Sequence, residues 1–354
     1  MRIIDNYIAK TVISGTLMVL LVLGALFAFV DFVSELDDVG KGQYSMLQAG
    51  AYVLLSLPKR LYEIFPTAVL IGSLLSLGTL AGNSEFTVMR AAGVSIMRIV
   101  LSVLKAGFIL LIFVALIGEL VVPHSERQAQ TLRAENLQQT ISLAGKGGFW
   151  ARDGQRFLYV SHVFPGMNLG KVNIYEFSKD NQLIRVTHAK SAQYVDDQWR
   201  LNNIQQTEFV ANGVESRTIK SEVWQKLLNP DLFNVVSVEP DNMSAIDLHK
   251  YTNYLKSNEL DASHYELAFW IKVFTPISSL VMLLIALPFI FGSQRSSGAG
   301  NRMLVGLLLG IGFYLLNRTV NHLGQVYHIY PFVSASAPVL FVAMASFYAL
   351  RKVK

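Results

Sequence analysis

The chain has 354 residues, of which 52% are hydrophobic and only 16% charged, whereas soluble domains carry about 25% charged residues. This shortage of charge is typical of a membrane protein, and the absence of cysteine excludes disulfides and thiolate metal sites. A helix needs roughly 20 apolar residues to cross a bilayer, and apolar stretches that approach this length recur along the chain. They lie near residues 11–30, 61–82, 99–122, 267–291, 303–323 and 331–350. The sequence therefore predicts a bundle of transmembrane helices.

The distribution of Lys and Arg predicts the orientation of the chain in its membrane. Basic residues gather at the N-terminus, between the second and third spans, between the fourth and fifth, and at the C-terminus. The segment 31–60 instead holds four acidic residues within its first eight positions. Because basic residues near span ends mark the cytoplasmic side, we expect both termini inside and the long insert 123–266 outside.

The second span contains proline and a face of small residues. We expect the segment 44–57 to lead into it as a surface helix or an early extension, broken near Pro58. Gly72, Ser73, Ser76 and Gly78 form a face of small residues that permits close helix contact, either within the chain or with a partner.

The short inside segment 84–93 predicts a helix of its own. Ser84 is suited to its N-cap and Gly93 to the position after its end. Phe86 and Met89 would share one face, flanked by Glu85 and Arg90. Such a helix could dock into a groove on a cytosolic protein, or it could be an interfacial turn resting on lipid.

The outside insert reads as a β domain with helical linkers. A helix-compatible stretch 125–137 precedes strand-like pieces, and residues 244–260 read as a returning helix. The strand-like pieces are 148–160, 172–177, 183–195, 199–210 and 215–224. Asn212-Gly213 is the clearest hairpin signal. Short strands at this spacing predict an all-β sandwich or jelly roll. The expected domains are thus helices 1–122, a β domain 123–266 and helices 267–354.

Cations near the expected outer membrane face run against the orientation bias. They are Lys41, Lys59, Arg60, Arg127, Arg133, Lys272 and Arg318. Each could simply pair with a neighbouring acid among Asp31, Glu35, Asp37, Asp38, Glu63, Glu119 and Glu126. Alternatively, several of them could bind the phosphates of an anionic lipid in the outer leaflet.

No catalytic motif stands out in the sequence. It holds no phosphate-binding loop of the G-x-x-x-x-G-K-[ST] type, no H-E-x-x-H and no G-x-S-x-G. The seven histidines are scattered; His162 and His188 fall in the β insert, while His322 and His328 lie near the outer end of the fifth span without the spacing of a metal site. We therefore expect no enzyme, no metal and no cofactor bound by this chain.

At this point the chain resembles the LptF/LptG family of lipopolysaccharide-export permeases, and its LptG branch more closely. The resemblance covers nearly the whole length, and its most specific mark is Ser84-Glu85-x-x-Val88-Met89-x-Ala91-x-Gly93. Further marks are Tyr7-Ile8, Phe32-Val33-x-x-Leu36, Leu57-Pro58-Lys59, Phe65-Pro66, Gly118-Glu119 with Pro123, and Phe289-x-Phe291-Gly292 with Arg295.

The resemblance implies a six-helix subunit with a periplasmic β-jelly-roll domain in a Gram-negative inner membrane. It implies an LptF-like partner in a heterodimer, an LptB-like ATPase dimer that holds ATP and Mg²⁺, an LptC-like bitopic protein and a periplasmic bridge. Lipopolysaccharide would be extracted from the outer leaflet and passed to that bridge, with no nucleic acid involved. The segment 84–93 would be the coupling helix, with Glu85 pairing with an LptB cation while Phe86 and Met89 fill its groove.

The resemblance also implies which residues meet the lipid. Lys59 and Arg133 match positions linked to the lipid's phosphates, and Lys41, Arg60, Lys272 and Arg318 complete the expected phosphate-binding set. Related members often carry a lysine in the register of Asp31, so Lys41 or the partner would supply that contact here. We expect the acyl chains in a cavity lined by Phe29, Phe65 and Tyr314, entered between the first and fifth spans. The sequence leaves two alternative functions open: a mechanotransmission scaffold that couples to an ATPase but moves no lipid, and an enzyme that acts on envelope lipid.

Overall fold

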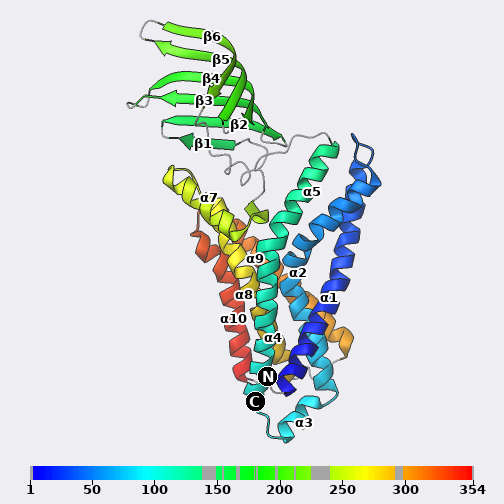
Figure 1. Ribbon diagram of the computed structural model, residues 1–354. Coiled ribbons are helices and arrows are strands. Elements are labelled where there is room, and N and C mark those ends of the chain that lie inside the picture. Colours follow the sequence, from blue (N-terminus) through cyan, green and yellow to red (C-terminus); the bar gives the residue numbers. More distant parts are fainter. Residues whose placement is uncertain are drawn as a thin grey trace. The chain divides into compact units, whose positions relative to one another are not determined.

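The computed structural model describes most of the chain as two compact units (Figure 1). The described residues are 3–137, 149–153, 155–164, 168–178, 180, 182–195, 198–210, 213–224, 240–291 and 298–352. The membrane unit comprises Met1–Ser34, Val53–Ser125 and Glu266–Lys354, and the β unit comprises Glu35–Tyr52 and Glu126–Tyr265. The expected boundaries at 122 and 267 fall close to two of these divisions, but residues 35–52, which we expected with the helices, belong to the β unit.

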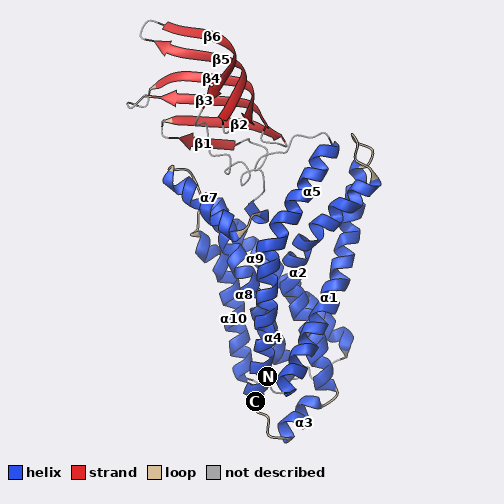
Figure 2. Cartoon of the chain, in the orientation of Figure 1, coloured by secondary structure: helices blue, strands red, loops and turns tan. Residues whose placement is uncertain are grey.

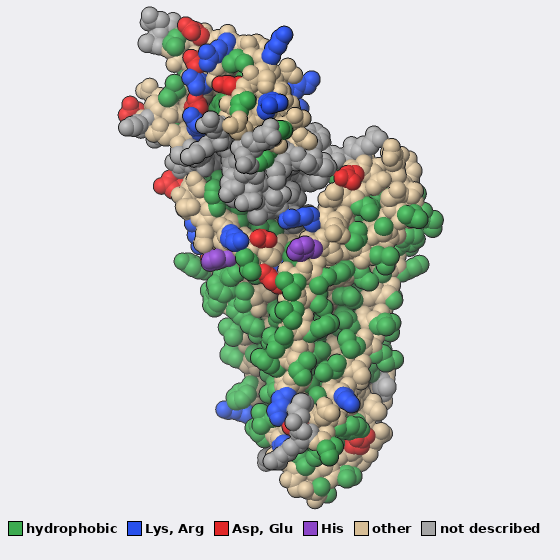
Figure 3. All heavy atoms as spheres, in the orientation of Figure 1, with side chains coloured by type: hydrophobic (Ala, Val, Ile, Leu, Met, Phe, Trp, Pro, Cys, Tyr) green, Lys and Arg blue, Asp and Glu red, His purple; other side chains and the backbone are tan. Residues whose placement is uncertain are grey.

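Six helices in the described residues are long and apolar enough to cross a membrane, which confirms the predicted bundle (Figure 2). The helices are α1 (Ile3–Glu35), α2 (Met46–Gly82), α4 (Ile96–Leu116), α8 (Ser263–Phe291), α9 (Ala299–Val326) and α10 (Pro331–Lys352), with the short α3 (Glu85–Ala91) between α2 and α4. The start of α1, the end of α10 and α3 lie at one end of the membrane unit (Figure 1). On the face shown in Figure 3, hydrophobic side chains cover the unit along its length.

The helices α1 and α2 cross at very short range. A Cβ added to Gly72 in α2 would lie 2.6 Å from the Cα of Thr16, and one added to Gly15 in α1 would lie 2.7 Å from the Cβ of Ser76. Since only glycine allows the two backbones to approach this closely, the small-residue face of α2 serves packing within the chain. That outcome matches the intrachain alternative for this face.

Two expectations about helix ends need correction. The helix α2 runs unbroken from Met46 to Gly82 with Pro58 and Pro66 inside it, so the expected break near Pro58 is absent. The segment 44–57 is thus an early extension of the second span rather than a separate surface helix, because the residues from Met46 onward already belong to α2. The third span also continues: α4 passes through one wider turn, η2 (Ile117–Val121), into α5 (Val122–Leu137).

The β unit contains a six-stranded antiparallel sheet in which every strand pairs with its neighbours in sequence. The strands are β1 (Phe149–Asp153), β2 (Arg156–Phe164), β3 (Asn168–Phe177), β4 (Leu183–Val195), β5 (Gln198–Val210) and β6 (Gly213–Trp224). The stretch 148–160, predicted as one strand, is a hairpin of β1 and β2. The hairpin predicted at residues 212–213 is confirmed by the pairing of Val210 with Gly213. An inserted β domain is therefore correct, but its described strands form one meander without the crossovers of a jelly roll.

The alternation of buried and exposed side chains shifts by one residue partway along the strands β3 and β5. In β5, Leu201 and Ile204 are both buried although they are three residues apart, so the alternation shifts at Asn203, whose φ is +52°. The equivalent irregularity in β3 falls at Lys171, with a φ of +50°. Left-handed residues inside strands disturb the regular pleat, so the alternation of buried and exposed side chains shifts at these two positions.

Helices connect the β unit to the membrane helices in sequence. The predicted helix 125–137 is α5, and the predicted helix 244–260 is α7 (Ala245–Ser257), preceded by the short turn η3 (Pro240–Asn242). Ser244 caps α7 because its Oγ accepts a hydrogen bond of 3.0 Å from the backbone N–H of Asp247. The other short turn, η1 (Leu36–Asp38), follows α1.

Candidate functional site

The short helix α3 begins after a left-handed residue and ends in a glycine turn. Ser84 precedes it in a left-handed conformation with a φ of +62° and makes no side-chain cap, so its predicted N-cap position is confirmed but the capping hydrogen bond is absent. At the other end, the N–H of Val94 donates to the carbonyl of Met89 and that of Gly93 to Arg90, both at 3.0 Å. With Gly93 at a φ of +85°, these two bonds form a Schellman ending, as its sequence position predicts.

The two faces of α3 differ sharply in burial. Phe86 is only 5% exposed, and its ring lies 5.4 Å from that of Phe291 at the end of α8. Met89 packs against the same core. Val88, in contrast, is 67% exposed, and Arg90 is exposed as well. The predicted ridge of Phe86 and Met89 thus faces this chain's own core, and the surface open to another protein is the opposite face.

Glu85 begins α3 and is held by the first membrane helix. The hydroxyl of Tyr7 donates a hydrogen bond of 2.9 Å to Oε2 of Glu85. Two residues earlier in α1, the buried carboxylate of Asp5 accepts hydrogen bonds from Ser102 at 2.6 Å and from Lys105 at 3.0 Å. The start of α1 is therefore fixed to α3 and to α4 at the same time.

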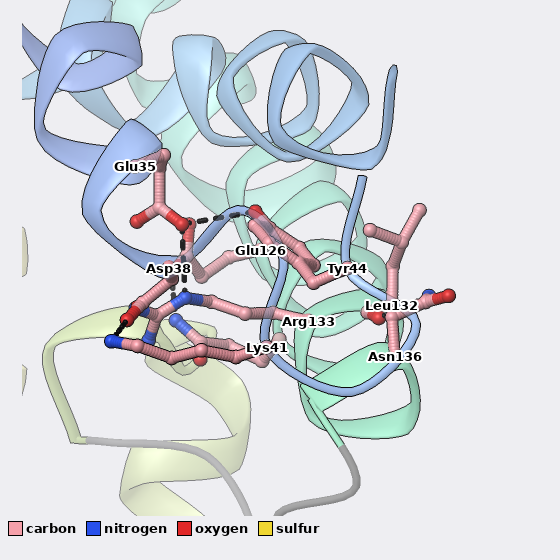
Figure 4. A network of polar contacts seen from close by, with 9 residues as sticks. Glu35, Asp38, Lys41, Tyr44, Glu126, Leu132, Arg133 and Asn136 are labelled. Carbon is pink, nitrogen blue, oxygen red and sulfur yellow. Dashed lines mark hydrogen bonds and ion pairs between the residues drawn. The ribbon is translucent and has the colours of Figure 1, made fainter. Parts of the chain in front are cut away.

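A network of polar contacts in the β unit surrounds Arg133 of α5 (Figure 4). Its Nε donates to Glu35 at 3.1 Å, and its Nη2 donates to Asp38. The Nζ of Lys41 donates to the other carboxylate oxygen of Asp38 at 2.6 Å. In these contacts two cations face two carboxylates, and the network also includes the buried carboxylate of Glu126 (Figure 4).

The hydroxyl of Tyr44 completes this network by donating to the same oxygen of Glu35 at 2.9 Å. Burial, together with the Glu35 carboxylate, raises the pKa of the Tyr44 phenol, so it remains a donor across the physiological range. The guanidinium of Arg133 also lies 5.5 Å from the centre of the Tyr52 ring. Arg133 is therefore held in one geometry by acids, a phenol and an aromatic face.

The remaining expected phosphate-binding residues lie in the membrane unit and differ in environment. Arg60 binds Asp31 through two hydrogen bonds of 2.7 and 3.0 Å and Glu63 through one of 3.3 Å. Lys59 is half-buried, and Lys272 is buried inside α8. Arg318 is exposed and donates to the hydroxyl of Tyr314 at 2.9 Å. Pairing with neighbouring acids, one of the two interpretations of these cations, thus holds for Lys41, Arg60 and Arg133.

The three residues expected to line an acyl cavity do not share one environment. Phe65 is 1% exposed in the core and lies 6.3 Å from the ring of Phe113. Phe29 in α1 and Tyr314 in α9 are 68% and 52% exposed. Only Phe29 and Tyr314 are therefore placed to meet lipid chains at the surface of this subunit.

Sequence reasoning missed the cluster around Asp5. Neither Asp5 nor Lys105 was expected to take part in a site, although a lysine inside an apolar span is itself a signal of an ionic or functional contact. No group of His, Asp and Glu suited to a metal ion occurs within the described ranges.

The comparisons with known proteins address the whole chain. Residues 6–352 match the family described as lipopolysaccharide export system permease LptF/LptG. The chain belongs to the LptF/LptG family. The lipopolysaccharide export system permease protein LptG of Escherichia coli K12 is 38% identical over 95% of this chain and 94% of its own length. The LptG protein of Haemophilus influenzae is 36% identical over 99% and 98%.

Within this family the chain stands nearer to LptG than to LptF. The LptF protein of Escherichia coli K12 is 23% identical over 91% of this chain and 87% of its own length, well below both LptG values. The predicted family and branch are therefore confirmed. Lipopolysaccharide export as a permease is the function that this family carries, and a scaffold that moves no lipid is not favoured.

Proposed function

We propose that this chain is the LptG-like permease subunit of an exporter that extracts lipopolysaccharide from the outer leaflet of the inner membrane. The match to the export permease family across residues 6–352 carries this proposal. An LptF-like paralogue forms the other half of the permease, and a separate LptB-like ATPase dimer supplies ATP hydrolysis. An LptC-like protein and a periplasmic bridge receive the lipid.

The charges of the membrane unit support an orientation with α3 in the cytoplasm. The end of the unit that holds α3 also carries Arg98, Arg351 and Lys352 at the ends of α4 and α10. Basic residues near span ends are retained on the cytoplasmic side. Both termini are then cytoplasmic, and the insert 123–266 is periplasmic.

The exposed helices support a route for lipid between the two permease subunits. Only 22% of the most apolar window of α1 and 17% of that of α9 is buried, the lowest values among the six spans. These first and fifth spans therefore present apolar surface to a partner or to lipid. Acyl chains enter there, beside Phe29 and Tyr314, and the phosphates meet the cations Lys59, Arg60 and Arg133.

Transport in this scheme requires two states with different affinities for the lipid. ATP-driven closure of the ATPase displaces α3, and the membrane helices then close the cavity. The closed state must bind lipopolysaccharide less tightly than the open state, because a ligand with equal affinity for both states cannot be moved by the change.

The coupling step is tested with Glu85→Ala and Glu85→Lys in the complete permease pair. We expect both variants to lose ATPase in a pull-down and to lose transport, with Glu85→Lys the more severe because it reverses the charge. Wild-type assembly and transport in both variants would exclude α3 as the coupling element.

The lipid contact is tested by photo-crosslinking to lipopolysaccharide. We expect the double variant Lys59→Glu with Arg133→Glu to crosslink less than the wild type, because phosphate is repelled by both new carboxylates. Unchanged crosslinking contradicts the phosphate contact. Mass spectrometry of the purified complex provides an independent check, since a scaffold that moves no lipid would carry no stoichiometric phosphorylated glycolipid.

A further inference from the structure

Among the described residues, the carboxylate of Glu85 accepts a hydrogen bond at one of its two oxygens. Oε2 accepts the hydrogen bond from the Tyr7 hydroxyl at 2.9 Å, and within the described part of the chain no hydrogen bond reaches Oε1. The side chain of Glu85 is partly exposed, so Oε1 can be approached by a group from another protein. The contact joins residues that are 78 positions apart in the sequence.

Tyr7 is itself a fixed donor. Its helix is pinned two residues earlier, where the buried Asp5 accepts hydrogen bonds from Ser102 and Lys105 of α4. A free glutamate side chain loses rotamer entropy when a partner fixes it. A donor that already holds one oxygen reduces this cost before the partner arrives.

We propose that Tyr7 is a positioning residue that holds Oε2 of Glu85 so that Oε1 faces a cationic side chain of the ATPase. This inference rests on the proposed docking of α3 against that ATPase. The same hydrogen bond ties α3 to α1, one of the two least buried spans of this unit, so the element that contacts the ATPase is linked directly to the start of an exposed helix. Tyr7 thus acts through Glu85 and touches neither the lipid nor the nucleotide.

A purely structural role for the Tyr7–Glu85 contact makes different predictions. If the bond only fixed α3 to the membrane unit, its loss would lower stability and would add to the loss caused by changing Glu85. If Tyr7 acts through Glu85, its loss should have no further effect once Glu85 no longer binds the partner, because interacting residues are non-additive in a double-mutant cycle.

The experiment measures the affinity of the ATPase for the permease pair in Tyr7→Phe, Glu85→Gln and the double variant. Tyr7→Phe removes only the hydroxyl. Tyr348→Phe is the matched control, since Tyr348 is 62% exposed near the end of α10 and its ring contact with Lys352 survives the change. The apparent Tm of each permease pair without ATPase is the second measurement.

We expect Tyr7→Phe to weaken ATPase binding about three- to fivefold, which is within the range for the net contribution of one ordinary hydrogen bond. Glu85→Gln should weaken binding further, and the double variant should match Glu85→Gln within about twofold. Tyr348→Phe should bind like the wild type, and the apparent Tm of Tyr7→Phe should stay unchanged.

Two results would contradict positioning by Tyr7 alone, and a third would contradict the docking of α3 as well. Wild-type affinity in Tyr7→Phe, or fully additive losses in the double variant, contradicts positioning of Glu85 by Tyr7 while leaving α3 as the coupling element. Wild-type affinity in Glu85→Gln contradicts the proposed docking of α3 itself, and positioning by Tyr7 is refuted with it.

Discussion

Replacing Phe86 with alanine should destabilise the permease itself, in the absence of any ATPase. A fully buried aromatic side chain removes about 150–250 Å² from water, which at about 25 cal/mol per Å² corresponds to about 4–6 kcal/mol. Phe86 is 5% exposed and packs on Phe291, so nearly all of this applies, and core Phe→Ala changes cost about 3–5 kcal/mol. The helix α3 has seven residues, too few to stay helical without this packing.

The assay is the apparent Tm of the permease pair in nanodiscs without ATPase. We expect Phe86→Ala to lower it by roughly 5–10 °C, taking about 2 °C per kcal/mol for a chain of this size. The control is Val88→Ala on the exposed face of α3, which should leave the Tm unchanged while weakening ATPase binding. If Phe86→Ala leaves the Tm within about 1 °C of wild type but abolishes ATPase binding, Phe86 contacts the partner and the burial argument is refuted.

Three further predictions follow from close contacts and ion pairs. Gly72→Val should prevent stable expression, because its Cβ would meet backbone at 2.6 Å, whereas Gly312→Val, with no atom within 4 Å, should express normally; equal expression contradicts the helix crossing. Glu35→Gln should raise photo-crosslinking of lipopolysaccharide by releasing Arg133 from one carboxylate, and a decrease would show that the pair is needed intact. Trp199→Ala, at a site 1% exposed, should cost about 3–5 kcal/mol and expose the sheet to limited proteolysis, with resistance as the contrary result.

The parts of the fold that follow from the hydrophobic periodicity and from the length of apolar stretches were predictable from the sequence. The apolar spans, the returning helix after the insert and the hairpin ending at Gly213 all depend on local patterns of hydrophobicity and turn residues. Local patterns do not specify which neighbour an element meets. The pairing of the described strands as one meander, and the persistence of α2 through Pro58, could therefore not be predicted from those patterns.

At the candidate site, too, the local pattern was predictable from the sequence and the long-range contacts were not. The sequence located α3 and identified Phe86 and Met89 as sharing one face, because spacing determines that. It could not tell whether that face turns toward the chain or toward a partner, since the deciding contact with Phe291 joins residues 205 positions apart. Tyr7 went unnoticed as a donor for the same reason: its partner Glu85 is 78 residues away.

The ion pairs of the cations bear on how a phosphate could bind here at all. Arg60 already holds Asp31 through two hydrogen bonds, and Arg133 holds Glu35 and Asp38, so a phosphate must take the place of carboxylates rather than fill a vacant site. Such an exchange yields less binding free energy than capture by an unpaired cation, because each released carboxylate must be solvated again or find another donor. A transporter benefits from this, since its sites must bind the cargo firmly enough to admit it and weakly enough to release it. We therefore expect the acids beside Arg60 and Arg133 to accelerate lipid release, and their neutral variants to retain lipid longer while turning over more slowly.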